Sequence, residues 1–192
     1  MARQIHKNFN IADYTYTNVF VETGTGYGMT SQKALDGGFK YVRSVELHDP
    51  IYQFCLEKFK DNEQIKLWHG RSYEKLPEMI SDINEPVTFF LDAHPSGPNT
   101  AGHDELVASN HSDTSEAHQH NIIKKELKVI SEHPIKNHTI LIDDQHGLHM
   151  QNLEYKKFLL ENVNSEYKFY FISDRDCVDQ ILLCTTEKII LI

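Results

Sequence analysis

Val19-Phe-Val-Glu-Thr-Gly-Thr-Gly-Tyr-Gly28 is the stretch of this sequence that decides the fold. A run of β-branched and aromatic residues leads into an acid, Glu22, and then into three glycines at alternate positions, Gly24, Gly26 and Gly28. The apolar run predicts a buried strand. The glycines predict a turn in which the backbone can approach a ligand, because no Cβ stands in the way. A strand that passes through such a turn into a helix forms a nucleotide-sized site.

The spacing of these glycines and the acid before them favour one class of nucleotide. The pattern is G-x-G-x-G, whereas the dinucleotide fingerprint is G-x-G-x-x-G, and position 29 is Met. Glu22 would repel a pyrophosphate but would suit a cationic amine. We therefore expect S-adenosylmethionine (SAM) as the cofactor rather than NAD, with Glu22 near its methionine moiety. The alternative is a glycine turn that serves only to reverse the chain.

Length, composition and charge limit the broad class of the protein. A chain of 192 residues with 40% hydrophobic and 24% charged residues fits one globular α/β domain. Its net charge of -9 argues against a nucleic-acid partner, since phosphate binding needs clustered Lys and Arg. No apolar run approaches about 18 residues, so no membrane partner is expected. The N-terminus lacks an apolar signal region, and the three cysteines lack a CxxC pattern, which predicts a cytoplasmic protein with reduced thiols.

Strands and helices alternate along most of the chain. Strands are expected at 17–22, 39–47, 65–69, 87–91, 139–142, 167–172 and 180–185, and helices at 30–36, 50–60, 73–83, 116–133 and 153–163. The apolar tail 189–192 could add one more strand. This order predicts a doubly wound, mostly parallel, seven-stranded Rossmann-like α/β sheet with an antiparallel C-terminal hairpin, in a single domain over 1–192. The segment 95–115, rich in Pro, Gly, Ser, Asn and His, is predicted to be an active-site loop, with a disordered segment as the alternative.

Ligands of such sheets bind outside the carboxyl ends of the strands, where this sequence places polar residues. Glu46 lies 22 positions after Gly24, near the distance at which an acid grips a ribose diol; the alternative is a surface glutamate. The third strand ends at the residues that would border an adenine ring, where Ser72 could bind the base or cap the next helix. The predicted cofactor-binding set is Glu22, Thr23, Gly24, Gly26, Gly28, Glu46, Leu47, Gly70, Arg71, Ser72 and Asp92.

The fourth and fifth strands are followed by carboxylates, Asp92 and the pair Asp143 and Asp144. Acids crowded at one rim repel one another unless a cation lies among them, and oxygen ligands suit Mg²⁺ or another divalent ion. We therefore predict a metal site at these three residues, with the capping of the following segments as the alternative. His94, two positions after Asp92, is the candidate general base, and the two form the predicted catalytic pair. A purely structural His94 is the alternative.

The other histidines do not predict a zinc site. His118 and His120 would point apart on a helix, and the sequence contains no paired cysteines and no H-E-x-x-H pattern.

With these residues in place, the sequence resembles the class I SAM-dependent methyltransferases from Val19 to Thr185. Val21-Glu-Thr-Gly-Thr-Gly-Tyr-Gly28 resembles the first motif of that family, and Ser44-Val-Glu-Leu47 resembles the segment with its ribose-binding acid. Within the superfamily the chain is most similar to the macrocin O-methyltransferase type, which acts on sugar hydroxyls. The resemblance implies Mg²⁺ at Asp92, Asp143 and Asp144, and a base at position 94, where the family has Asp and this chain has His.

The expected function is therefore SAM-dependent O-methylation of a hydroxyl on a small acceptor, a sugar or glycan unit, with divalent-cation assistance. The chain has little N-terminal extension to cover such a site, so a homo-oligomer is considered. Two alternatives stay open. A non-catalytic SAM-binding module would keep Glu22, the glycines and Glu46 but would not need the acids at the rim. An NAD-linked oxidoreductase fits Glu46 but not the methionine at position 29.

Overall fold

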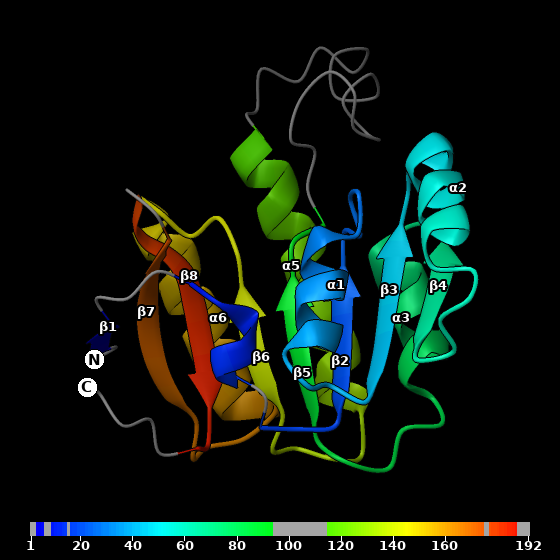
Figure 1. The fold of residues 1–192 in the computed structure, drawn as a ribbon. Helices are drawn as coiled ribbons and strands as arrows, with labels where there is room; N and C mark the ends of the chain where they lie inside the picture. The colour runs from blue at the N-terminus through cyan, green and yellow to red at the C-terminus, as the bar shows by residue number, and fades with distance from the viewer. Residues whose placement is uncertain (1–2, 6–8, 15, 94–114, 175–176, 188–192) are drawn as a thin grey trace.

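One eight-stranded sheet organises the fold in the computed structural model, which describes residues 3–5, 9–14, 16–93, 115–174 and 177–187 (Figure 1). The strands are β1 (Arg3–Ile5), β2 (Val19–Thr23), β3 (Tyr41–Glu46), β4 (Ile65–His69), β5 (Val87–Leu91), β6 (Thr139–Ile142), β7 (Lys168–Asp174) and β8 (Cys177–Thr185). Their order across the sheet is β1-β7-β8-β6-β5-β2-β3-β4. All neighbours are parallel except β8, which runs antiparallel to both β6 and β7. The predicted fold class, with its antiparallel C-terminal hairpin, is confirmed.

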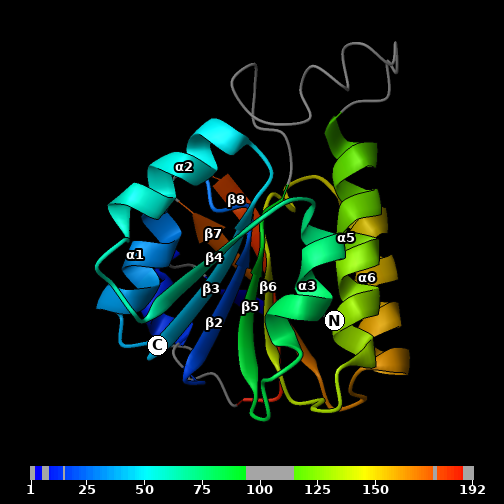
Figure 2. The ribbon, with the colours of Figure 1, turned by 90° about the vertical axis from the view of Figure 1, so that its right-hand side faces the viewer.

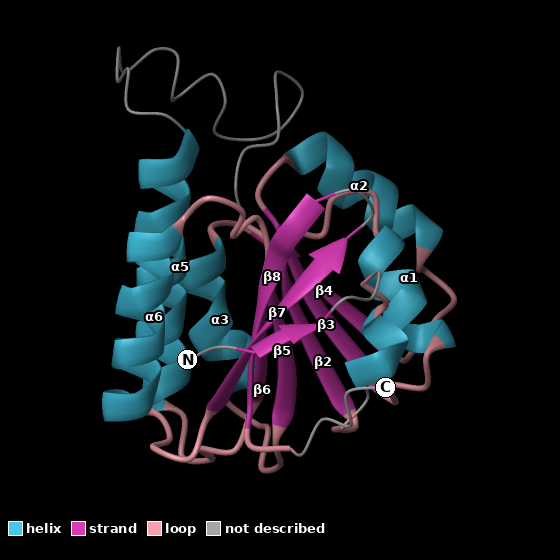
Figure 3. Cartoon of the chain, turned by 90° about the vertical axis from the view of Figure 1, so that its left-hand side faces the viewer, coloured by secondary structure: helices cyan, strands magenta, loops and turns pink. Residues whose placement is uncertain are grey.

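Helices cover both faces of this sheet (Figure 2; Figure 3). The helices are η1 (Ile11–Tyr14), α1 (Met29–Asp36), α2 (Asp49–Lys58), α3 (Ser72–Ile80), α5 (Ser115–Glu132) and α6 (His149–Asn162). α1 and α2 lie on one face, and α3, α5 and α6 lie on the other (Figure 2). Within the described ranges, no helix combines the length and apolar character needed to cross a membrane.

The central strands are buried on both faces, as their mostly apolar sequences predict. Every residue of β2, β5 and β6 is buried. Side chains alternate between the faces: Val19 and Val21 belong to the core under α3, α5 and α6, whereas Phe20 joins Ala34 and Phe39 in the core under α1. These two cores hold the carboxyl ends of the strands in register, and the candidate site lies at those ends.

The N-terminal segment adds two elements that the sequence did not predict. β1 pairs in parallel with β7, with Arg3 opposite Tyr170, and η1 packs its Ile11 and Tyr14 into the core under α1. A three-residue edge strand has no periodicity of its own, so only its tertiary pairing defines it. The further strand considered at 189–192 lies outside the described residues.

Two buried histidines form a hydrogen-bonded chain at the amino ends of β5 and β6. The N–H of Val87 donates to Nδ1 of His138 (3.1 Å), so the proton of this ring is on Nε2. That nitrogen lies 3.2 Å from Nδ1 of His133, whose Nε2 lies 3.1 Å from the carbonyl oxygen of Ile83. These contacts favour the neutral form of His138. Burial, followed by the neighbouring charge of His133, lowers the pKa of His138 to about 3.

We expect His138 to destabilise the fold in mild acid. Its folded pKa of about 3 lies below the unfolded value of 6.5, so the unfolded chain binds more protons and stability is lost as the pH falls below about 6.5. The stability advantage of the wild type over His138→Asn should shrink by about 2 kcal/mol between about pH 7 and pH 5. Urea denaturation of both proteins at the two pH values measures this, and a constant difference would contradict it.

Candidate functional site

The glycine turn after β2 brings the ends of three strands together. The N–H groups of Gly24 and Thr25 both donate to the carbonyl oxygen of Val45, at 3.0 and 3.1 Å. Gly24 has a φ of +83°, and a Cβ at this position would lie 2.4 Å from the carbonyl oxygen of Asp92. Only glycine fits between the end of β2 and the end of β5. The turn then passes directly into α1, as the sequence predicts.

α2 supports this turn from the other side. Nζ of Lys58 donates to the carbonyl oxygens of Tyr27 and Gly28, both at 2.9 Å. The thiol of Cys55 donates to the carbonyl oxygen of Gly26 at 3.1 Å. Three successive carbonyls are thus held by side chains of one helix, so the shape of the turn is fixed without a ligand.

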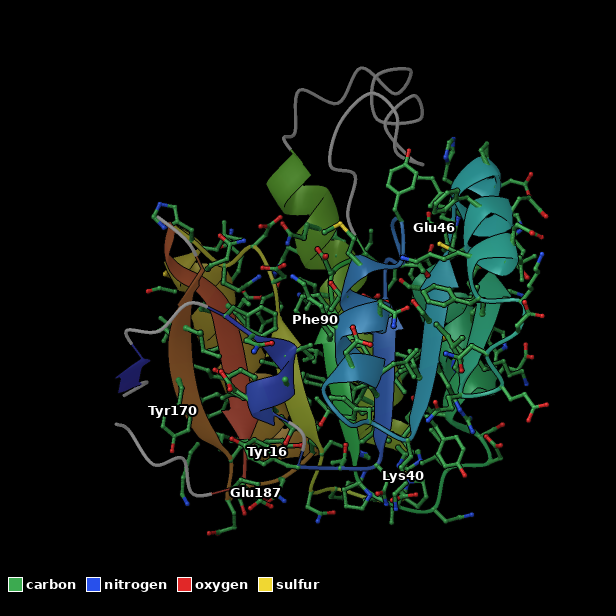
Figure 4. All side chains as sticks on the ribbon, in the orientation of Figure 1. Tyr16, Lys40, Glu46, Phe90, Tyr170 and Glu187 are labelled. Carbon is green, nitrogen blue, oxygen red and sulfur yellow. The ribbon has the colours of Figure 1, made fainter. Side chains whose placement is uncertain are left out.

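Glu46, the predicted ribose-binding acid, lies at the end of β3 beside the turn (Figure 4). Its Oε2 accepts the N–H of Gly26 (2.9 Å), and its Oε1 accepts the N–H of His48 (2.8 Å). The side chain is 8% exposed, so the carboxylate has a single orientation at the edge of the site. The sequence did not predict the hydrogen bond between Glu46 and Gly26, which connects this acid directly to the glycine turn.

Glu22 is enclosed rather than open to solvent. It is 1% exposed, and its Oε2 accepts hydrogen bonds from the hydroxyls of Ser31 (2.5 Å) and Ser44 (2.8 Å). Burial raises the pKa of Glu22 to about 8; the negative charges of Asp92 and Glu46 also raise it, against the lowering effect of the two serine hydrogen bonds. Contact between Glu22 and a ligand stays a prediction, but the three acids lie within electrostatic reach of one another.

The remaining predicted cofactor residues lie along the same edge. Thr23 is buried and its Oγ1 accepts the N–H of Asp92 (3.3 Å). Leu47 is exposed after β3, and the N–H of Gly70 donates to the carbonyl oxygen of Glu46 (2.9 Å), which ties β4 to β3.

At the predicted adenine border, Arg71 is the N-cap residue of α3 and Ser72 is its first helical residue. No side chain caps this helix, so the capping role considered for Ser72 is not observed. Binding of the base by either residue stays a prediction.

The acids after β5 and β6 lie on neighbouring strands, as predicted. The N–H of Asp143 donates to the carbonyl oxygen of Leu91 (3.1 Å), and the N–H of Asp144 donates to Oδ1 of Asp143 (2.7 Å). Burial, and next the charge of Asp92, raise the pKa of the Asp143 carboxyl. Asp144 has a left-handed backbone, with a φ of +54°.

The arrangement of these acids does not support the predicted metal site. In the part of the chain that the structure describes, no three His, Cys, Asp or Glu side chains gather so as to hold a metal ion. The side-chain amide of Gln180, on β8, donates to carboxylate oxygens of both Asp143 and Asp144. A donor group therefore occupies the space between the paired acids, where a cation would need free oxygen atoms. No step of the chemistry is assigned to a metal.

Several side chains of the site were missed because sequence patterns do not place them. Ser44 lies opposite Glu22 in the parallel register of β2 and β3, and Gln180 reaches the rim from the antiparallel strand. On α5, Nε2 of Gln119 donates to the carbonyl oxygen of Asp143 (3.3 Å). Knowledge of the strand register would have identified Ser44 and Gln180, but not Gln119 on α5. His94 and the predicted loop, apart from its last residue, lie outside the described residues.

Comparison with known proteins identifies the fold. Neither a protein-family model nor a curated protein sequence matches the chain. Among solved structures, a Staphylococcus aureus protein to which caffeoyl-CoA O-methyltransferase activity is attributed has a TM-score of 0.55 at 16% identity, over 92% of this chain and 81% of its own. A Streptococcus mutans protein regarded as a methyltransferase, solved in complex with S-adenosylhomocysteine (SAH), has a TM-score of 0.53 at 13% identity, over 88% of each chain. The chain therefore has the class I methyltransferase fold.

A third similar structure corrects the prediction that nucleic acid is excluded as a partner. The 23S rRNA methyltransferase ErmE has a TM-score of 0.52 at 13% identity, over 95% of this chain and 68% of its own. Proteins of this fold thus include an enzyme named for an RNA substrate, and the exclusion was wrong. The net charge of -9 sums the whole chain, whereas binding depends on where the lysines and arginines lie.

Proposed function

We propose that this protein is a SAM-dependent methyltransferase that acts on a hydroxyl group. The observation that carries the proposal is the group of acids around the glycine turn. Glu22, Glu46 and Asp92 come from three neighbouring strands, and the charges of the latter two raise the pKa of the first. A group of carboxyl groups gathered at a nucleotide-sized turn is suited to a cationic nucleoside, whose positive charge would favour the ionised form of Glu22.

The same charges favour SAM over NAD. SAM carries a sulfonium and an ammonium group, which the carboxylates attract. NAD would bring a pyrophosphate to the turn, where the charges of Asp92 and Glu46 would repel it. Gly24 also lies so close to the backbone of Asp92 that a Cβ would fill the space between them. These observations support SAM against the oxidoreductase alternative.

We propose distinct roles for the chain's own residues. When bound, SAM would supply a methyl group that its positively charged sulfur activates for transfer to the acceptor oxygen, with SAH as the leaving group. Glu46 would hold the ribose hydroxyls, and the glycine turn would position the methionine portion. The acceptor hydroxyl must lose its proton to a base; His94 stays the predicted base, and Asp92, at the end of β5, stays its predicted catalytic partner.

The family resemblance supports a sugar or glycan hydroxyl as the acceptor, because the macrocin type acts on such groups. Divalent-cation assistance stays a prediction from that resemblance alone. The cytoplasm is proposed as the compartment, since the described cysteines Cys55 and Cys184 are buried free thiols.

The test of the proposal is calorimetric titration of the purified protein with SAH and, in parallel, with NAD. We expect SAH to bind and NAD to give no heat of binding. Binding of NAD alone would overturn the proposal. Transfer of a radiolabelled methyl group to glycan or ribosomal RNA acceptors then separates an enzyme from a non-catalytic SAM-binding module. The same assay in the presence of EDTA tests whether methyl transfer needs a divalent cation.

Glu46→Gln should weaken SAH binding about tenfold, because a neutral amide cannot accept from the ribose hydroxyls while it also accepts both backbone N–H groups. Asp49→Asn, on the exposed first turn of α2, is the matched control and should bind SAH like the wild type. Isothermal titration of both variants measures the effect, and equal affinities would remove Glu46 from the site.

A further inference from the structure

A groove opens between α5 and α6 on the helical face that does not carry the proposed cofactor-binding turn. These two helices lie side by side against the sheet (Figure 2; Figure 3). The groove has a volume of about 490 Å³. Its floor is apolar and consists of Leu127 and Tyr155, which are buried, and Phe158, which is partly buried. This volume is in the range of sites that bind ligands or side chains of a partner.

The walls of the groove carry positive charge, although the chain as a whole is acidic. Four lysines line it, Lys124, Lys125, Lys128 and Lys157, against two glutamates, Glu154 and Glu161. Each glutamate already lies near a lysine: Glu154 is 3.5 Å from Lys124, and Glu161 is 4.0 Å from Lys157. The groove therefore keeps a net positive charge in a protein with a net charge of -9.

Lysines and exposed leucines recur at intervals of one helical turn along α5 and α6. Lys124 and Lys128 are one turn apart on α5, so their side chains lie on the same face. On α6, the exposed Leu153 and Leu160 lie one turn before and one turn after Lys157. An apolar surface flanked by regularly spaced cations therefore runs along both helices.

We propose that this groove binds an amphipathic helix of an acidic partner protein. Leucine-like side chains of the partner would cover the floor at Leu127 and Phe158, and its flanking carboxylates would pair with Lys124 and Lys128. This is the helix-in-groove mode, in which apolar anchors provide affinity and charges set the orientation. The proposal does not rest on the methyltransferase assignment, because none of these residues belongs to the proposed SAM site.

Two other occupants fit the groove less well. Single-stranded nucleic acid stacks its bases on exposed aromatic rings. Of the two rings in the groove, Tyr155 is 1% exposed, with its hydroxyl hydrogen-bonded to Nδ1 of His120 (2.7 Å), and Phe158 is partly buried. A second copy of this chain in a two-fold contact would place the same lysine-lined walls opposite each other. Both occupants are outcomes that the experiment can detect.

The test uses the full chain and a fluorescein-labelled helical peptide of about four turns, with leucines at i, i+3, i+4 and i+7 and glutamates elsewhere. Fluorescence anisotropy measures its affinity for the wild type and for the double variant Lys124→Glu/Lys128→Glu. The matched control is Lys33→Glu/Lys40→Glu, which changes the charge equally; Lys33 is on α1, and Lys40 lies at the opposite end of the sheet from Glu46 (Figure 4). Thermal unfolding checks that each variant keeps its fold.

We expect the groove variant to bind the peptide at least about tenfold more weakly than the wild type and the control, which should match each other, and we expect binding to weaken in high salt. A benzophenone in place of one leucine should crosslink to α5 or α6. The proposal is overturned if the wild type does not bind the peptide, if a lysine-substituted peptide binds equally, or if the crosslink forms elsewhere. It is also overturned if the groove variant instead loses binding to single-stranded RNA or loses self-association in sedimentation.

Discussion

Replacing Gly24 by alanine is expected to lower the free energy of unfolding by about 3 kcal/mol and to abolish SAH binding. The φ of +83° is unfavourable for any residue with a Cβ, and the new methyl group would lie 2.4 Å from the carbonyl oxygen of Asp92. Because that contact is with backbone, β5 would have to move away from β2. The N–H of Asp92 would then lose its bond to the carbonyl oxygen of Thr23 (3.1 Å). The ends of both strands at the proposed site would change together.

Gly26→Ala is the matched control for this change. Gly26 is in the same turn and also has a positive φ, +51°, but a Cβ there would meet no atom within 4 Å. Its substitution should cost about 1 kcal/mol, the usual penalty for a left-handed residue with a side chain. Thermal and urea unfolding measure both variants, and calorimetry with SAH measures binding. Equal losses of stability would show that the clash with Asp92 is not what requires glycine at position 24.

The arrangement of strands was predictable because the apolar sequence of each central strand indicates that the strand is buried. β5 and β6 are apolar except for one threonine each, and both occupy the predicted residues, 87–91 and 139–142. The glycine turn and Glu46 were found for the same reason, since polar residues and glycines interrupt such runs only where a strand ends. β1 could not be predicted, because three residues at an edge gain their structure from β7 alone.

The surroundings of the acids were less predictable than their positions. Parallel strands place Asp92 and Asp143 at one rim, and from this the sequence suggested a cation. The structure instead brings Gln180 from β8 to the paired acids, a contact set by the antiparallel register of β6 and β8 that no local pattern encodes. The cluster of lysines on α5 and α6 was likewise not predictable from the net charge, because a sum over the chain carries no information about where the charges lie.

Glu22→Gln is expected to stabilise the protein while it weakens SAM binding. Burial raises the pKa of Glu22 from 4.5 to about 8, so the folded state holds a proton that the unfolded chain releases. A raised pKa in the folded state means that stability is present below about 4.5 and is lost as the pH rises through about 8. Glutamine does not titrate, and its amide oxygen can accept from Ser31 and Ser44 as the carboxylate does. At about pH 7 the variant should be more stable than the wild type by about 3 kcal/mol.

Ser44→Ala gives the control for this stability change. It removes a hydroxyl that donates to Glu22 but keeps the buried carboxyl group, so it should lower stability rather than raise it. Urea denaturation between about pH 5 and pH 8 should show the advantage of Glu22→Gln growing with pH. An advantage that does not change with pH would mean that the buried carboxyl does not titrate in this range.

The same carboxyl links cofactor binding to pH. A cationic ligand near Glu22 favours its ionised form, so SAM binding to the wild type should release a proton and should tighten as the pH rises toward about 8. In Glu22→Gln this part of the pH dependence disappears, and at about pH 8 SAM should bind at least about tenfold more weakly than to the wild type. Calorimetry in two buffers of different ionisation enthalpy counts the released protons. Proton release that is identical in the wild type and in Glu22→Gln would contradict the inference. It would mean that the bound cofactor does not lower the pKa of Glu22, the buried acid before the glycine turn.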